Sequence, residues 1–234
     1  MKQLKFIILI MIAVFMASCI KDENQSSGVG DALIVTKKID GNTVYGISLY
    51  AYTFSSFQSV KVVSEAHIDK TYTLKSYNGS KTNFYYETPD ADFTATKPEA
   101  STYDFSAIFE NGVSNGFLDQ LSALTLPLPN IEKCEYNLTK LQIEVNWTLL
   151  TEADNYAITI LDGSTIVFGS TQLAKTIKAY AISASGGGWA AGFTPQNGKT
   201  YTVRLLAFML EPAGDSYNVQ ATSISDSTVV WGTN

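Results

Sequence analysis

Few residues of this 234-residue chain have the types and spacing that catalysis or metal binding requires. His67 is the only histidine in the sequence, and Cys134 lies far from it along the chain. A thiol nucleophile needs a histidine base beside it, so we expect Cys134 to be a small apolar residue and His67 to lie at the surface. Asp90 and Asp92 could share a calcium ion, but their position next to Pro89 favours a polar turn. We therefore predict no catalytic residues, no metal site and no cofactor.

The other cysteine, Cys19, is placed for a different chemistry. It follows Ala17 and Ser18, which end a segment with a basic start and an apolar run over residues 6–16. The run is too short for a spanning helix, which needs about 20 residues, and the pattern is typical of a signal peptide. The small residues before the cysteine resemble the lipobox of bacterial lipoproteins. That resemblance implies a signal peptide over residues 1–18 and acylation of Cys19, with simple secretion as the alternative.

The residues behind Cys19 indicate where the protein is anchored. Residues 19–30 are small and polar, which predicts a lipidated tether. Lys21, Asp22 and Glu23 resemble the export signal of Bacteroidetes lipoproteins, which implies display on the outer face of the outer membrane. A solvated tether with periplasmic orientation remains the alternative. We expect the outer membrane to be a partner through the N-terminal acyl chains, in which each buried methylene contributes about 0.8 kcal/mol.

Composition sets limits on partners and fold. The formal net charge is −6, and only 16% of the residues are charged, which argues against nucleic acid as a partner. Tyr, Phe, Val, Thr and Ser are plentiful, as they are in half-buried strands. Because lipid occupies Cys19 in this interpretation, Cys134 has no disulfide partner, and the hydrophobic cores alone must stabilise the fold.

The first half of the chain predicts a β-sandwich over residues 31–126. Residues 43–54 alternate between a polar and a more apolar face, as a strand with one buried face does. Asn111 and Gly112 form a hairpin-turn signal. About seven short strands at this spacing are typical of a sandwich, and we expect them at residues 32–35, 43–54, 59–65, 71–76, 84–86, 93–95 and 103–110.

A second β-sandwich is predicted over residues 127–234. The segment 126–130, with two prolines in alternate positions, predicts a short and semi-rigid linker. Trp147 ends an alternating run, and Tyr201 follows a proline within the pattern Tyr-x-Val-x-Leu. In this order, these features resemble a fibronectin type III domain. The resemblance implies that Trp147 packs in the core and that Tyr201 forms a tyrosine corner, with its phenol hydrogen-bonded to backbone upstream.

The first half repeats part of this pattern around Tyr103, which follows Pro98 as Tyr201 follows its own proline. We therefore assign Tyr103 a structural role like that of Tyr201. The first half contains no tryptophan, so an immunoglobulin-like and a fibronectin-like sandwich both remain open for it. The predicted fold class is thus all-β, with two tandem sandwiches.

Aromatic residues supply the ligand-binding candidates. Exposed rings can stack on sugars through apolar burial and contacts to the ring face. Trp189 follows a glycine-rich stretch, residues 186–188, that reads as a mobile loop, and it is the first candidate. Trp231, Tyr85 and Tyr86 are the next. The alternative is that each ring covers one end of a sandwich core.

These features predict a non-catalytic, lipid-anchored binding or adhesion module for a glycan or protein ligand. An assembly component, such as a pilus-associated subunit that donates a strand to its neighbour, is the alternative. A hydrolase of unfamiliar type ranks last.

Overall fold

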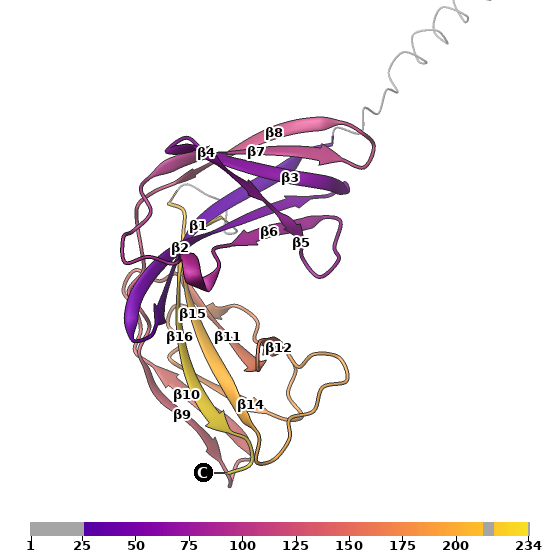
Figure 1. Ribbon diagram of the computed structural model, residues 1–234. Coiled ribbons are helices and arrows are strands. Elements are labelled where there is room, and N and C mark those ends of the chain that lie inside the picture. The colour runs from indigo at the N-terminus through magenta and orange to yellow at the C-terminus, as the bar shows by residue number, and fades with distance from the viewer. Residues whose placement is uncertain (1–25, 213–217, 234) are drawn as a thin grey trace, which may run out of the picture.

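The computed structural model describes residues 26–212 and 218–233, and these residues form two β-sandwiches (Figure 1). The all-β prediction is therefore confirmed. Cys19, the signal peptide and most of the predicted tether lie outside the described residues. Among the residues that are described, none belongs to a helix long and apolar enough to cross a membrane.

The first sandwich packs two four-stranded layers against each other. One layer has the order β1 (Gly28–Ile39), β2 (Asn42–Thr53), β6 (Asn83–Glu87) and β5 (Lys75–Ser76). The other has the order β4 (His67–Thr73), β3 (Phe57–Ser64), β7 (Ser101–Phe109) and β8 (Ser114–Leu121). Every second residue of β7, from Tyr103 to Phe109, is buried, as period-two alternation requires.

The second sandwich has a three-stranded layer of β9 (Ile131–Asn137), β10 (Gln142–Trp147) and β14 (Ala179–Ser183). Its second layer has the order β12 (Thr165–Gly169), β11 (Asn155–Asp162), β15 (Thr200–Leu210) and β16 (Val219–Val230), and β13 (Leu173–Ala174) pairs with β11. The core between these layers is built around Trp147, Tyr156 and Tyr201, which are among the largest fully buried side chains.

Two buried tyrosines tie loops of the second sandwich to its core. The backbone N–H of Gln196 donates to the phenol oxygen of Tyr201 over 3.0 Å, which is the hydrogen bond of a tyrosine corner. The N–H of Leu150 donates in the same way to Tyr156 over 2.6 Å. The ring of Trp147 lies 5.7 Å from that of Tyr156. Tyr156 and Tyr201 therefore each bury a large ring and also accept a hydrogen bond from a loop N–H.

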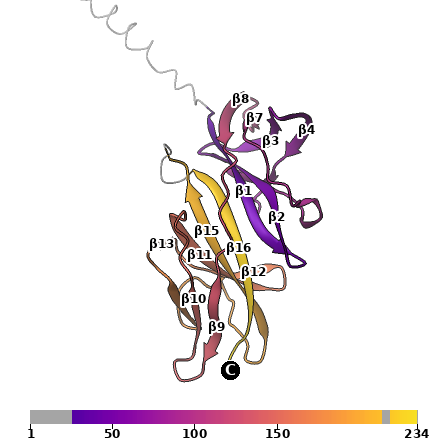
Figure 2. The ribbon, with the colours of Figure 1, turned by 90° about the vertical axis from the view of Figure 1, so that its left-hand side faces the viewer.

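A parallel pairing joins the two sandwiches. Residues 34–36 of β1 pair with residues 221–223 of β16, and the layers that contain these strands become one nine-stranded sheet (Figure 2). The pairing covers part of one strand edge of each sandwich, which otherwise presents unpaired backbone groups. The linker was predicted from sequence, but this joint was not.

The register places both cores on one face of the shared sheet. Ile34 of the first core pairs with Ala221 of the second, and directly paired residues point to the same side. Two buried hydroxyls, those of Thr36 and Ser223, oppose each other on this face, and neither has a hydrogen-bond partner among the described residues. The opposite face carries a third apolar cluster, which we call the joint cluster: Leu33, Val35, Phe93 and Ile224.

The structure corrects several sequence-based boundaries. Residues 93–95 do not form a strand, and Thr94 makes only an isolated bridge to Tyr45, after the short 3-10 helix η1 (Asp90–Asp92). The strand β8 was not predicted. The strand β1 begins at Gly28, within the predicted tether, and Leu126 is buried in the second core.

Candidate functional site

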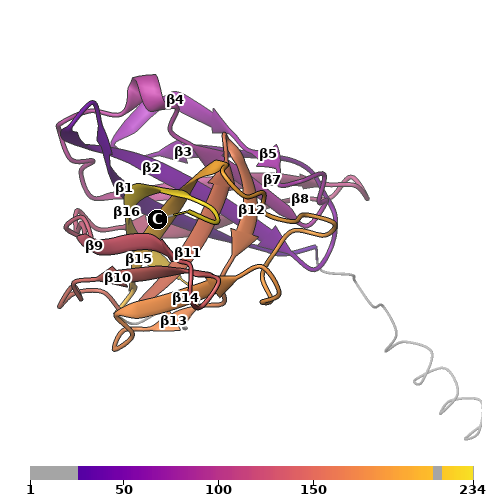
Figure 3. The same ribbon diagram turned by 90° about the horizontal axis from the view of Figure 1, so that it is seen from below.

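The free face of the shared sheet is concave, and it is hollowed between the two arms. Seen from the side and from below, β5 and β6 of the first arm and the β11–β12 hairpin of the second lie on the same side of the molecule (Figures 1 and 3). A cleft of about 580 Å³ lies between them, and a second hollow of about 460 Å³ adjoins it. Lys37, Asp90 and Arg204 line both. We call the two hollows together the inter-arm cleft.

Tyr85 and Tyr86 line one wall of the inter-arm cleft, and Tyr50 and Tyr77 contact Tyr85 from outside its lining. Tyr85 of β6 lines it, with its ring stacked on that of Tyr50 at 6.5 Å and edge-on to that of Tyr77 at 5.4 Å. Tyr50 and Tyr77 are both more than 40% exposed. Burial of the hydroxyl, assisted by Glu87, raises the pKa of Tyr50 to about 12, so it remains a neutral donor at physiological pH. This wall offers apolar ring surface together with hydroxyl groups.

Paired charges form the floor and the opposite wall. Arg204 donates from Nε and Nη2 to the two carboxylate oxygens of Asp226, each over 2.9 Å, and this pairing raises the pKa of the guanidinium. The Lys37 ammonium lies 3.8 Å from the centre of the Phe93 ring and donates to Asp90 over 2.5 Å. These side chains are held in place and largely neutralise one another.

The arrangement suits a ligand that is polar but uncharged overall. Sites at domain boundaries commonly combine apolar walls with a few fixed polar groups. Tyr85 offers a ring face, while Arg204, Asp226 and Asp90 offer donors and acceptors whose positions their own ion pairs fix. A ligand that contacts both would need an apolar face together with hydroxyl or other neutral polar groups.

The four predicted ligand-binding aromatics do not form one site. Tyr85 and Tyr86 of β6 both line the inter-arm cleft, but Tyr86 is partly buried against the first core, with its ring 5.0 Å from that of Tyr72. The expectation of a ligand contact by Tyr86 therefore stays a prediction, with less of its ring free than a fully exposed tyrosine has. Alternation explains why only Tyr86 packs against the core, because it pairs with the buried Leu49 whereas Tyr85 pairs with the exposed Tyr50.

Trp189 and Trp231 lie together at the end of the second sandwich. Trp231 is 3% exposed, so it has no free ring face, and the predicted contact is corrected. The ring of Trp189 stacks on Phe193 at 5.6 Å and meets Phe168 edge-on at 5.0 Å, and its indole N–H donates to the Ser183 carbonyl. The ring of Trp189 therefore packs against the core, as the alternative interpretation had it.

The other residues considered in the sequence analysis, Tyr103, Cys134 and His67, lie outside the inter-arm cleft. Tyr103 is buried in the first core, and burial raises its pKa to about 12 although its hydroxyl bonds to Ser64. Cys134 is half-buried beside the second core, and burial raises the pKa of its thiol. His67 is exposed, with Nε2 3.7 Å from a carboxylate oxygen of Glu99.

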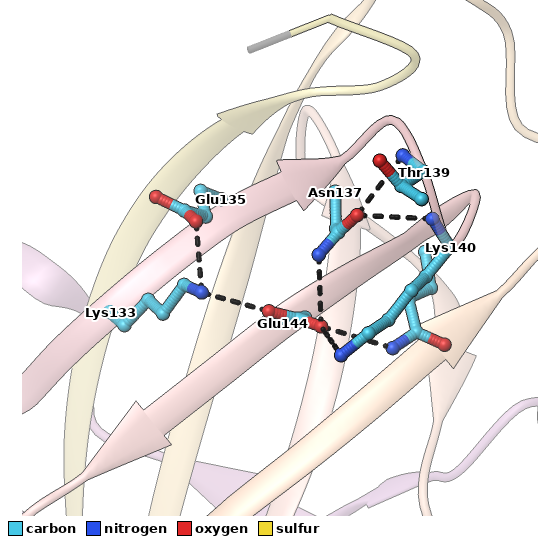
Figure 4. Close-up of polar contacts among 7 residues, drawn as sticks. Lys133, Glu135, Asn137, Thr139, Lys140 and Glu144 are labelled. Atoms are coloured by element: carbon cyan, nitrogen blue, oxygen red, sulfur yellow. Dashed lines mark hydrogen bonds and ion pairs between the residues drawn. The ribbon is translucent and has the colours of Figure 1, made fainter.

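A charged network covers the outer face of β9 and β10 (Figure 4). Glu144 accepts from Lys133 over 2.8 Å and from Lys140 over 2.9 Å, and Asn137 and Gln142 add amide donors. These donors, led by Lys133 and Lys140, lower the pKa of Glu144 to about 2. The network lies on a solvent-exposed sheet face. Its positive and negative side chains pair with one another.

Replacing Glu144 with glutamine should lower stability at neutral pH, because the variant loses both ion pairs. A carboxylate whose pKa is depressed in the folded state contributes stability above its unfolded pKa and loses it as pH falls through the folded pKa. Thermal unfolding should therefore show a gap in Tm between wild type and E144Q that narrows below about pH 4, and that also narrows in high salt. A gap that is unaffected by both pH and salt contradicts an electrostatic origin.

The fold defines the class of protein as a two-sandwich, fibronectin type III-like or immunoglobulin-like all-β chain. Comparison with family models and with curated proteins finds no match. Among solved structures, a two-domain fibronectin type III segment of chicken tenascin matches at 12% identity and TM-score 0.28, over 77% of this chain and 91% of that one.

Two further solved structures match in part. A BSP domain of a biofilm-associated protein matches at 18% identity and TM-score 0.25, over 80% of this chain and 28% of that one. A β-1,2-glucanase from Parabacteroides distasonis matches at 13% identity and TM-score 0.26, over 86% of this chain and 36% of that one. Likenesses at these identities and TM-scores assign no family, ligand or activity to the chain.

Proposed function

We propose that this protein is a non-catalytic, lipid-anchored surface module of a bacterial outer membrane, and that it binds a neutral glycan in the inter-arm cleft. One observation supports the proposed ligand. The Tyr85 ring and the ion pair of Arg204 with Asp226 line the same cleft from different sandwiches. The anchor rests on Cys19 and the segment before it.

The geometry supports a binding role through its rigidity. The sheet that forms the cleft is continuous through both arms, and backbone pairing of β1 with β16 joins the tyrosine wall to the charged wall. Preorganised groups lose less entropy on binding than mobile ones do. A protein ligand is the second candidate, and it would place an exposed polar turn in the cleft.

Replacing Tyr85 with alanine should weaken glycan binding about tenfold, because removal of one stacked ring costs about 1.5 kcal/mol. A glycan array with the chain from Ser26 onwards identifies the ligand, and calorimetry of wild type and Y85A measures the change. The matched control is Y52A, which removes another exposed ring of the same sheet face outside the cleft.

Unchanged affinity of Y85A, together with binding elsewhere on the molecule, excludes the cleft as the site. The anchor is tested separately by the intact mass of the N-terminal peptide from membranes of the producing cell. A peptide that begins at Cys19 and carries acyl chains is expected, and an unmodified peptide contradicts the anchor without affecting the array result.

A further inference from the structure

Exposed apolar side chains gather at one end of the first sandwich. Phe54 directly follows β2 and is 94% exposed, and its ring meets that of Tyr52 edge-on at 5.1 Å. Val29 of β1 is the cross-strand partner of Tyr52 and is 57% exposed. Val113, in the turn between β7 and β8, is exposed as well. Single exposed apolar residues are common, but this set is grouped at one end.

The same end is where the described chain begins. The Thr53 hydroxyl donates to the Ser27 carbonyl over 2.6 Å, which fixes the start of the chain beside Phe54. Side chains of Asn111 and Asn115 donate to the hydroxyl and carbonyl oxygens of Ser26 over 2.9 and 3.0 Å. Residues 26–27 are thus held between the end of β2 and the β7–β8 turn, with the exposed apolar residues on both sides.

The distance to the expected acylation site is short. The seven steps from Cys19 to Ser26 can span at most about 25 Å. This inference rests on the acyl anchor of the proposed function: if Cys19 is acylated, the end of the sandwich that carries Phe54 cannot move far from the bilayer surface.

We propose that this end of the first sandwich lies against the membrane, with Phe54, Tyr52, Val29 and Val113 inserted at the boundary between lipid headgroups and acyl chains. Aromatic rings are favoured at that depth. Several acyl chains already hold the N-terminus at the bilayer, so the apolar contacts of this end would set the orientation of the first sandwich on the membrane.

The charges near this end are compatible with such a contact. The Lys81 ammonium donates to Glu110 over 2.7 Å, and the backbone of these two residues bonds to Phe57 and Ser56 next to Phe54. Neighbouring charges that compensate each other oppose approach to lipid less than a single uncompensated charge does. None of Phe54, Tyr52, Val29 and Val113 lines the inter-arm cleft, so the proposed membrane contact and the proposed ligand use different residues.

The test places a tryptophan at the contact in the full acylated chain. F54W, purified from membranes, is reconstituted into phosphatidylcholine vesicles with or without bromine atoms near the headgroup end of the acyl chains. The emission of the new tryptophan is the difference between F54W and wild type. It should fall by roughly half in brominated vesicles, because a ring at the headgroup boundary lies close to the bromine atoms. Phe54 is too exposed for this change to disturb the core, and an unchanged Tm checks this.

The matched control is I68W. Ile68 is 79% exposed and lies on β4 near its turn with β3, beside the end of β3 opposite to Phe57. Its added emission should be unaffected by bromine. Equal quenching in F54W and I68W, or none in either, in a chain whose mass shows acylation overturns the membrane contact and leaves the anchor intact. A chain without acyl groups overturns both.

Discussion

Replacing Trp147 with alanine should lower the free energy of unfolding of the second sandwich by about 3–5 kcal/mol. Trp147 is one of the largest fully buried side chains, and its truncation leaves a cavity beside Tyr156 that the surrounding strands cannot close. Urea unfolding followed by near-ultraviolet circular dichroism measures the loss through the tyrosine signal.

The matched variant is W147F. The indole N–H of Trp147 has no hydrogen-bond partner among the described residues, so the change to phenylalanine removes volume without breaking a hydrogen bond seen there. It should cost about 1–2 kcal/mol. If W147A and W147F are equally destabilising, the ring does not support the core in the way that its burial indicates.

Replacing Val35 with aspartate should destabilise the whole protein by about 4 kcal/mol or more, because it buries an unpaired charge in the joint cluster. Val35 packs with Leu33, Phe93 and Ile224, which come from both sides of the joint. We expect wild type to unfold in one transition and V35D in two, because the variant separates the stabilities of the two sandwiches. Calorimetry resolves the number of transitions.

Two controls isolate the joint. V29D makes the same change at an exposed position of the same strand and should alter stability by no more than about 0.5 kcal/mol. T36V removes a buried hydroxyl that has no partner among the described residues, so it should be neutral or stabilising. A single transition in V35D, with a midpoint equal to that of V29D, contradicts a stabilising joint.

The parts of the fold that sequence predicts are those with clear local patterns. Alternation over residues 43–54 predicted β2, and the order of Trp147 and Tyr201 predicted a fibronectin-like second sandwich. The strand β8 escaped because only Asp119 and Leu121 of its eight residues are buried, which leaves little alternation to detect. The joint escaped because it pairs residues near opposite ends of the chain, and no local pattern specifies such a partner.

The candidate site was predictable only in part, and for related reasons. Tyr85 was singled out as an aromatic, but which of Tyr85 and Tyr86 faces outward depends on register with β2. Arg204 and Asp226 are ordinary strand residues in the sequence, and they become a site only because β15 and β16 place them opposite each other. The prediction for Trp189 was based on its glycine-rich neighbours, which are typical of a mobile loop. In the structure an isolated β-bridge to Phe168 holds this segment against the second sandwich, and the ring packs on Phe168.

The position of β1 determines how the protein carries mechanical load. The strand pairs with β2 along its whole length and with β16 over residues 34–36, and the anchor that we propose at Cys19 would pull on its first residues. If the proposed ligand is held between the arms and resists that pull, tension would run along β1 and load its ladder with β2 in shear. Many hydrogen bonds would then share the force at once, and the strand that follows the proposed anchor would resist traction through its whole ladder.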